Sequence, residues 1–303
     1  MVGDKTHFRW ALLMSAIVVL LLCSSSLAGP TTPYSVPKIE DIGLAVVSNG
    51  NAHYFGSMGG KPLKRAVVGM ASTPDGNGYW EVASDGGIFA FGDAGFQGSS
   101  GGETLSKPVV GMASTPDGKG YWEVASDGGI FAFGDAGFYG SLPSLHVTAL
   151  GTVVGMASTP DGKGYWEVAS DGGIFAFGDA GFHGSMGGET LSKPIIGMAS
   201  TPDGKGYWEV ARDGGIFAFG DAGFYGSMGG QPLIKGVVGM APTPDGKGYW
   251  EVASDGGIFA FGDAGFYGSM GGQPLIKAVE GMASTPDGKG YWEVARDGGI
   301  FAL

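Results

Sequence analysis

Residues 197–228 read GMASTPDGKGYWEVARDGGIFAFGDAGFYGSM, and close copies of this string fill most of the chain. A repeat that returns at a fixed period indicates a ring-shaped or solenoid architecture. The copies begin at Gly69, Gly111, Gly155, Gly197, Gly239 and Gly281. Because neighbouring copies start 42 or 44 residues apart, we expect six structural units of nearly equal size.

The unit that starts near Val67 predicts four short strands and no helix. The strands are expected at residues 67–73, 79–84, 88–92 and 96–99. The strings PDGNG, DGG and DAG separate them, and their Pro, Asp and Gly residues are typical of tight turns. Short apolar runs separated by such turns favour an antiparallel meander. Each unit is therefore expected to form one four-stranded blade.

The two ends of the repeat region predict that the units close into a ring. The last unit stops at Leu303, within its third strand, whereas residues 52–58 match residues 264–270 of a fourth strand. We therefore expect an all-β, six-bladed β-propeller closed by an N-terminal strand that completes the last blade. An open β-solenoid is the alternative, but it needs distinct capping units and would not divide one unit between two termini.

The chain is expected to consist of three segments. These are a signal peptide at residues 1–28, a linker at 29–42 and the propeller at 43–303, whose last unit is completed by residues 43–66. Lys5 and Arg9 precede an apolar run and a small-residue stretch at Ala28, which is the layout of a secretory signal. The sequence thus predicts a secreted protein. Association with the cell envelope stays open.

Cys23 is the only cysteine, so cleavage after Ala28 leaves a mature protein without disulfides. Lipid anchoring at Cys23 is disfavoured because Leu22 is large where a lipoprotein signal carries a small residue. The net charge is −12, and no cluster of Lys or Arg appears along the sequence. Nucleic acid is therefore not an expected partner, and no membrane insertion is expected after signal cleavage.

The repeat GMASTPDGKGYWEVASDGGIFAFGDAGFYGS resembles a tandem repeat of secreted actinobacterial proteins. The resemblance covers about residues 43–303 and implies a propeller-like fold without a firmly assigned activity. More distantly, DGGIFAFGD is similar to a strand of quinoprotein-type propeller repeats. The chain has no unique cofactor-binding constellation, so this second resemblance implies architecture and no quinone.

The repetition itself argues against a single catalytic centre, because an enzyme needs unlike groups placed asymmetrically. The second strand of each unit carries one glutamate: Glu81, Glu123, Glu167, Glu209, Glu251 and Glu293. These glutamates are expected to be structural. His53, His146 and His183 share no metal-ligand spacing, and the Asp-Gly turns lack the spacing of a calcium loop. We expect no enzyme, no metal and no cofactor, with calcium at the turns left open.

The predicted ligand-binding residues lie where the copies differ. One position of the fourth strand varies: Gln97, Tyr139, His183, Tyr225 and Tyr267. The residue before it is constant: Phe96, Phe138, Phe182, Phe224 and Phe266. Strand alternation turns the two sets to opposite sides. We expect the constant set in the core and the variable set exposed on the outer rim as ligand contacts. The variable links between units add His146, although drift of unconstrained surface positions explains the variation equally well.

These features together predict a non-enzymatic extracellular binding module that recognises surface carbohydrate through several equal sites. One alternative is a structural or protein-interaction scaffold of the cell envelope. A second alternative is a propeller glycoside hydrolase with its site in the central channel. The hydrolase requires unique polar residues on the strands nearest the axis, and Glu280 is the one charged departure there.

Overall fold

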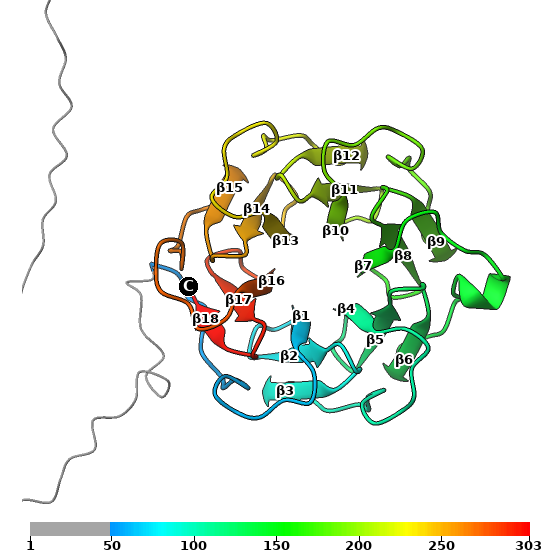
Figure 1. Cartoon of the computed structure of the whole chain (residues 1–303), viewed down its shortest axis with the longest axis horizontal. Coiled ribbons are helices and arrows are strands. Elements are labelled where there is room, and N and C mark those ends of the chain that lie inside the picture. Colours follow the sequence, from blue (N-terminus) through cyan, green and yellow to red (C-terminus); the bar gives the residue numbers. More distant parts are fainter. Residues whose placement is uncertain (1–48) are drawn as a thin grey trace, which may run out of the picture. The chain divides into compact units, whose positions relative to one another are not determined.

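The computed structural model describes residues 49–303, so the expected signal peptide, the linker and residues 43–48 lie outside the described part. The described residues form six three-stranded antiparallel sheets. Figure 1 shows these sheets following one another in chain order around a common centre. The prediction of an all-β chain built from six repeated units is confirmed.

Each sheet has an inner, a middle and an outer strand (Figure 1). The inner strands are β1 (Val67–Ser72), β4 (Val109–Ser114), β7 (Val153–Ser158), β10 (Ile195–Ser200), β13 (Val237–Pro242) and β16 (Val279–Ser284). The middle strands are β2 (Gly78–Ala83), β5 (Gly120–Ala125), β8 (Gly164–Ala169), β11 (Gly206–Ala211), β14 (Gly248–Ala253) and β17 (Tyr291–Ala295). The outer strands are β3 (Ile88–Gly92), β6 (Ile130–Gly134), β9 (Ile174–Gly178), β12 (Ile216–Gly220), β15 (Ile258–Gly262) and β18 (Ile300–Ala302).

The middle strand is buried along its whole length because it lies between two strands of its own sheet and between two neighbouring sheets. Its sequence, GYWEVA, accordingly carries large aromatic and β-branched residues that fit a pleated, buried surface. In the first sheet, Ser72 of β1 lies opposite Tyr79 of β2, and the register shifts between Val67 and Gly69. Such a bulge bends the inner strand locally.

The inner strands stand side by side around the centre, and glycine allows them to approach closely. A Cβ atom on Gly69 would lie 3.9 Å from the Cα of Gly111, and one on Gly281 would lie 3.9 Å from the Cα of Gly69. Strand β16 of the last sheet therefore packs against β1 of the first, as β1 packs against β4. The six inner strands form a continuous circle (Figure 1).

The predicted fourth strand does not form, and this prediction is wrong. Residues 94–99 follow β3 as irregular backbone, and equivalent residues follow β6, β9, β12 and β15. Gly98 has a φ of +128°, outside the extended region that a strand requires. We name these stretches the rim segments: residues 51–58, 93–100, 135–142, 179–186, 221–228 and 263–270. Side-chain hydrogen bonds hold the rim segments in place of the backbone hydrogen bonds of a β-sheet. For example, the indole Nε1 of Trp80 donates to the carbonyl of Gly95 at 2.8 Å.

The N-terminal rim segment runs along the last sheet. The N–H of Asn51 donates to the carbonyl of Lys289 at 3.0 Å, and the N–H of Met58 donates to that of Gly298 at 2.9 Å. The N–H of Asp93 makes the equivalent bond to Asn77 within the first repeat. Residues 51–58 thus occupy, beside the last sheet, the position that each other rim segment occupies beside its own sheet.

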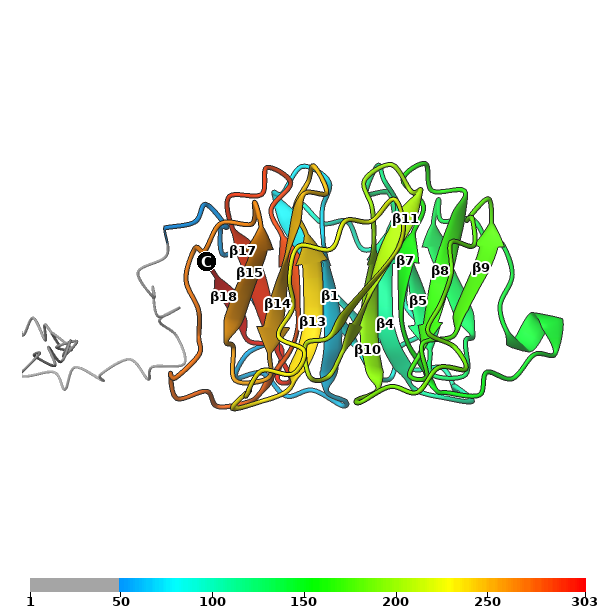
Figure 2. The ribbon, with the colours of Figure 1, turned by 90° about the horizontal axis from the view of Figure 1, so that it is seen from above.

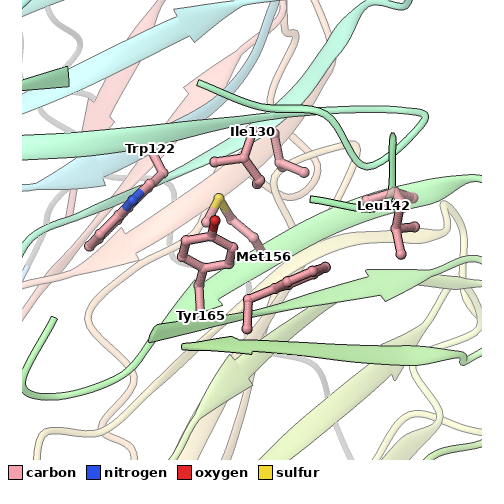
Figure 3. Close-up of a cluster of buried hydrophobic side chains, with 8 residues drawn as sticks. Trp122, Ile130, Leu142, Met156 and Tyr165 are labelled. Carbon is pink, nitrogen blue, oxygen red and sulfur yellow. The ribbon is translucent and has the colours of Figure 1, made fainter. Parts of the chain in front are cut away.

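The hydrophobic core is divided among the seams between adjacent sheets. Figure 3 shows one seam, in which Trp122 and Ile130 of one repeat pack with Met156 and Tyr165 of the next, together with Leu142 of the rim segment. The rings of Trp122 and Tyr165 lie 5.8 Å apart between centroids. Every seam draws its residues from two repeats, so no repeat buries its apolar surface alone.

The ring has two different ends, between which the strands run (Figure 2). The hairpin end carries the turns between inner and middle strands, such as residues 73–77. The link end carries the DGG turns and the links that enter the inner strands, because the start of β1 pairs with the end of β2. A ligand can therefore reach the ring at either of these ends or on its outer rim.

Candidate functional site

The structure reverses the orientation predicted for the phenylalanines and for three of the five variable residues. The constant phenylalanines are the exposed set, with 63% of Phe96, 64% of Phe182 and 63% of Phe224 accessible. Phe138 and Phe266 are exposed to a similar degree. In the variable set, Tyr139, His183 and Tyr267 are half-buried, Tyr225 lies at the border of exposure, and Gln97 is exposed. The phenylalanines therefore do not belong to the core.

A tyrosine of the next repeat holds the backbone of the variable residues, and it turns the half-buried ones toward the seam. The N–H of Tyr139 donates to the hydroxyl of Tyr165 at 3.1 Å, and that hydroxyl donates to the carbonyl of Gly140 at 2.5 Å. The ring of Tyr139 lies 5.8 Å from the ring of Tyr165, and its own hydroxyl donates to Gly162 at 2.9 Å. The same ring contact recurs for His183, Tyr225 and Tyr267, so the aromatic members of the variable set pack against the neighbouring repeat.

The exposed set forms an array with one aromatic ring per repeat around the outer rim. Tyr54 stands at the equivalent position in the N-terminal rim segment, because the indole of Trp292 donates to His53 as that of Trp80 donates to Gly95. Its side chain is 55% exposed. The neighbouring residues of this segment differ from the other copies, yet the exposed position remains aromatic. The exposed ring is the constant feature of the rim.

The channel at the centre opens at the hairpin end into a cavity of about 380 Å³. Its lining repeats a Ser-Thr-Pro triplet from each sheet, and Pro242 replaces the serine in one of them. The threonines are engaged in their own turns: the hydroxyl of Thr73 donates to Asp75 and accepts from the N–H of Gly78. The lining thus offers weakly bonded serine hydroxyls, such as that of Ser72, which lies 3.4 Å from the carbonyl of Ser284.

Glu280 is the departure from this symmetry that the sequence singled out. It lies on β16, half-buried, and its carboxylate is 3.6 Å from a guanidinium nitrogen of Arg296. Burial raises the pKa of Glu280, and the charges of Arg296 and Arg212 oppose that effect. The hydrolase alternative would rest on this single carboxyl group.

The repeated glutamates of the middle strands are fully buried in the seams. The carboxylate of Glu209 faces the DGG turn and rim segment of the preceding repeat, where the N–H of Met186 approaches it at 3.4 Å. Both carboxylate oxygens of Glu81, Glu167, Glu251 and Glu293 lack a hydrogen-bond partner among the described residues. Burial raises the pKa of Glu123 to about 7 and that of each other seam glutamate to about 8. Burial therefore favours the protonated form of these groups near neutral pH, least strongly at Glu123.

The three histidines within residues 49–303 lie in two different rim segments and one link. His53 and His146 are exposed, and His146 has a left-handed backbone after η2 (Pro143–Leu145). His183 packs against Tyr207 with ring centroids 5.5 Å apart. Within residues 49–303, no group of three or more His, Cys, Asp or Glu side chains is placed to hold a metal ion.

Comparison with models of protein families and with curated proteins finds no match for this chain. Among the described residues, no helix has the length and apolar character needed to cross a membrane.

Proposed function

We propose that the chain is a six-bladed β-propeller that works outside the cell as a non-enzymatic, multivalent binding module for carbohydrate. The circle of inner strands and the hydrogen bonds of residues 51–58 to the last sheet support a ring closed by its N-terminal segment. The layout of the first 28 residues supports secretion. The ligand contacts are assigned to the exposed rim aromatics instead of the variable residues beside them.

The observation that carries this proposal is the array of exposed aromatic rings at one position of every repeat. Isolated exposed apolar residues are common on protein surfaces and need no explanation. Here a large ring stays exposed at each equivalent position, although packing in the seams does not use it. A role in the fold does not account for it, whereas a role in binding does.

Carbohydrate is the ligand class that fits such rings. The electron-rich face of an aromatic ring attracts polarised C–H groups, which one face of a pyranose presents. A single contact of this kind is weak, but six sites fixed on one ring gain avidity on a repetitive polymer. A polysaccharide displays its repeating units in the matching multivalent form.

The test is a glycan array followed by affinity measurement on purified protein. We expect replacement of one rim aromatic by Ala to weaken polysaccharide binding slightly, and replacement of all six to abolish it. Thermal stability should change little because the rings are exposed. The matched control replaces Ile234 and Ile276, which are also exposed but lie at the link end. Absence of glycan binding, or unchanged binding in the six-site variant, would contradict the proposal.

A further inference from the structure

The link end gathers cations that the sequence keeps far apart. The position two residues before each inner strand holds Arg65, Lys107, Gly151, Lys193, Lys235 and Lys277. Arg212 joins them at the end of β11. Its N–H donates to the carbonyl of Pro194 at 2.9 Å, and its carbonyl accepts from Val237 at 3.0 Å. Arg212 therefore lies between the link that contains Lys193 and the link that contains Lys235.

Arg296 holds the equivalent place two repeats further round the ring. Its N–H donates to the carbonyl of Ala278 at 2.9 Å, and its carbonyl accepts from the N–H of Val67 at 3.0 Å. It thus lies between Lys277 and Arg65. The backbone bonds fix the order of these exposed side chains along one continuous strip.

The links are not equivalent in charge. Those at 101–108 and 187–194 read GGETLSKP and contain a glutamate. Those at 229–236, 271–278 and 59–66 read GGQPLIKG, GGQPLIKA and GGKPLKRA, without any acidic residue. These three links follow one another around the ring. We name them, with Arg212 and Arg296, the cationic arc.

Two aliphatic side chains stand exposed within the arc. Ile234 is 92% exposed and Ile276 is 73% exposed. The preceding residue of each link, Leu233 or Leu275, is the one that packs against a core cluster. The equivalent positions in the acidic links are serines, Ser106 and Ser192. The isoleucines are therefore dispensable for the fold and specific to the arc.

The carboxylates beside the arc already have hydrogen-bond or ion-pair partners. Asp213, Asp255 and Asp297 are half-buried in DGG turns, where each accepts the N–H of the glycine two residues later at 3.2 Å. Glu280 is the ion-pair partner of Arg296. No fully exposed side chain of the three links or of Arg212 and Arg296 is therefore acidic: these side chains are cationic, aliphatic or, at Gln231 and Gln273, neutral amides.

The hairpin end, in contrast, carries more carboxylates than cations. Lys119, Lys163, Lys205 and Lys247 each form an ion pair with an Asp two residues earlier, at 2.8 to 3.0 Å. A second set of aspartates, Asp93, Asp135, Asp179, Asp221 and Asp263, lies at this same end without matching cations in the turns. The balance of side-chain charge therefore differs between the two ends of the ring.

We propose that the cationic arc docks on the surface of a lipid bilayer that carries anionic headgroups. Exposed aliphatic side chains flanked by Lys and Arg are the combination that an anionic membrane interface accepts. Ile234 and Ile276 enter the interfacial layer while the surrounding cations face the phosphates. The chain remains outside the hydrocarbon core. This proposal is independent of carbohydrate binding at the rim, which lies on a different surface.

The experiment measures co-sedimentation of the protein with vesicles of phosphatidylcholine alone or mixed with phosphatidylglycerol. We expect binding to the mixed vesicles at low salt and a steep loss of binding as ionic strength rises. The key variant converts both isoleucine links to the chain's own alternative: Q231E, P232T and I234S with Q273E, P274T and I276S. Because the chain already uses ETLSK at two equivalent links, this variant should fold.

The variant is expected to lower vesicle affinity more than about tenfold, since burying even one Ile side chain is worth roughly that factor. The reverse change, E103Q with T104P and S106I, should raise affinity. Replacing Lys119 and Lys163 by Ser at the hairpin end should leave it unchanged. Equal binding to both vesicle types would overturn the proposal. Binding to dextran sulfate as strong as to vesicles, unaffected by the isoleucine changes, would indicate a polyanion site and would also overturn it.

Discussion

The indole Nε1 of Trp292 donates a hydrogen bond of 2.8 Å to the backbone carbonyl of His53, a residue 239 positions earlier in the chain. The other five tryptophans of the repeats make this bond within their own repeat, as Trp80 does with Gly95. The last repeat therefore depends on the N-terminal rim segment for its outer cover. The two parts are joined there by non-covalent contacts alone.

Removal of residues 49–60 is expected to open the ring. It would expose Trp292 and leave the hydroxyl of Tyr79 without its acceptor, the carbonyl of Gly56. Uncovered apolar surface and an unpaired edge promote aggregation. Light scattering and thermal melting would report aggregates and a lower melting temperature. A monomeric deletion product with an unchanged, cooperative melt would contradict closure by this segment.

Tyr165→Phe should destabilise the fold by about 1–3 kcal/mol, because the lost hydroxyl leaves the carbonyl of Gly140 and the N–H of Tyr139 unpaired. Denaturant unfolding measures the difference. Tyr54→Phe is the matched control: its hydroxyl bonds only Ser57, at 3.1 Å on an exposed surface. That control should change stability by less than about 0.5 kcal/mol. Equal effects of the two changes would refute the structural role of the seam tyrosine.

Stability should fall as the pH rises from 5 to 8. An unperturbed glutamate ionises near 4.5, whereas burial raises the pKa of Glu167 to about 8, so the folded state holds a proton that the unfolded state releases. The stabilisation is complete below pH 4.5 and is lost as the pH approaches 8. Hydrogen bonds from Lys119 lower the pKa of Asp117 to about 2, which acts in the opposite direction only in stronger acid. Melting temperatures across this pH range provide the measurement.

Glu167→Gln should flatten this pH dependence and raise stability at pH 8, because the amide cannot ionise. Exposed Glu103 supplies the control, since Glu103→Gln removes a carboxylate that lies in a link. A slope that stays the same in Glu167→Gln would show that the seam carboxyls do not titrate as proposed.

Gly172→Ala is expected to be far more damaging than Gly188→Ala. Both glycines have positive φ, +81° and +89°, so both substitutions incur about 1–2 kcal/mol of backbone strain. A Cβ at Gly172 would also overlap that of Met186 and lie 2.9 Å from Oε2 of Glu209, whereas nothing lies within 4 Å at Gly188. Chemical denaturation of the two variants should separate the strain from the overlap in the seam.

The period of the repeats and the turn residues were enough to predict six sheets and, to within one residue, the bounds of the three strands that the first sheet contains. The third strand expected at residues 88–92 is β3, and the inner strand ends one residue earlier than expected, at Ser72. The fourth strand failed because composition does not reveal that Gly98 has a positive φ. Side-chain bonds from Trp80 and Tyr121 hold that segment, and such bonds leave no periodic pattern in a sequence.

The sequence pointed to the right segment for the candidate site and to the wrong residue within it. Alternation applies to a strand, and without one Phe138 and Tyr139 exchange their expected sides. A residue that is the same in every copy is readily interpreted as buried, yet Phe138, which is constant, is exposed. The sequence alone did not reveal the cationic arc, because Lys235 and Lys277 are 42 residues apart in sequence and share one surface only through the placement of successive links at the same end of the ring.

The seams between the sheets are interchangeable, because each is assembled from the same Trp, Tyr and rim contacts. A sheet therefore has no means of distinguishing its true neighbour from the corresponding sheet of a second copy. Only chain connectivity and the speed of intramolecular closure favour the correct assembly, and repeat proteins are prone to exchange segments during folding. Refolding at high protein concentration should therefore favour rings that share sheets between two chains, whereas dilution should favour the monomeric ring.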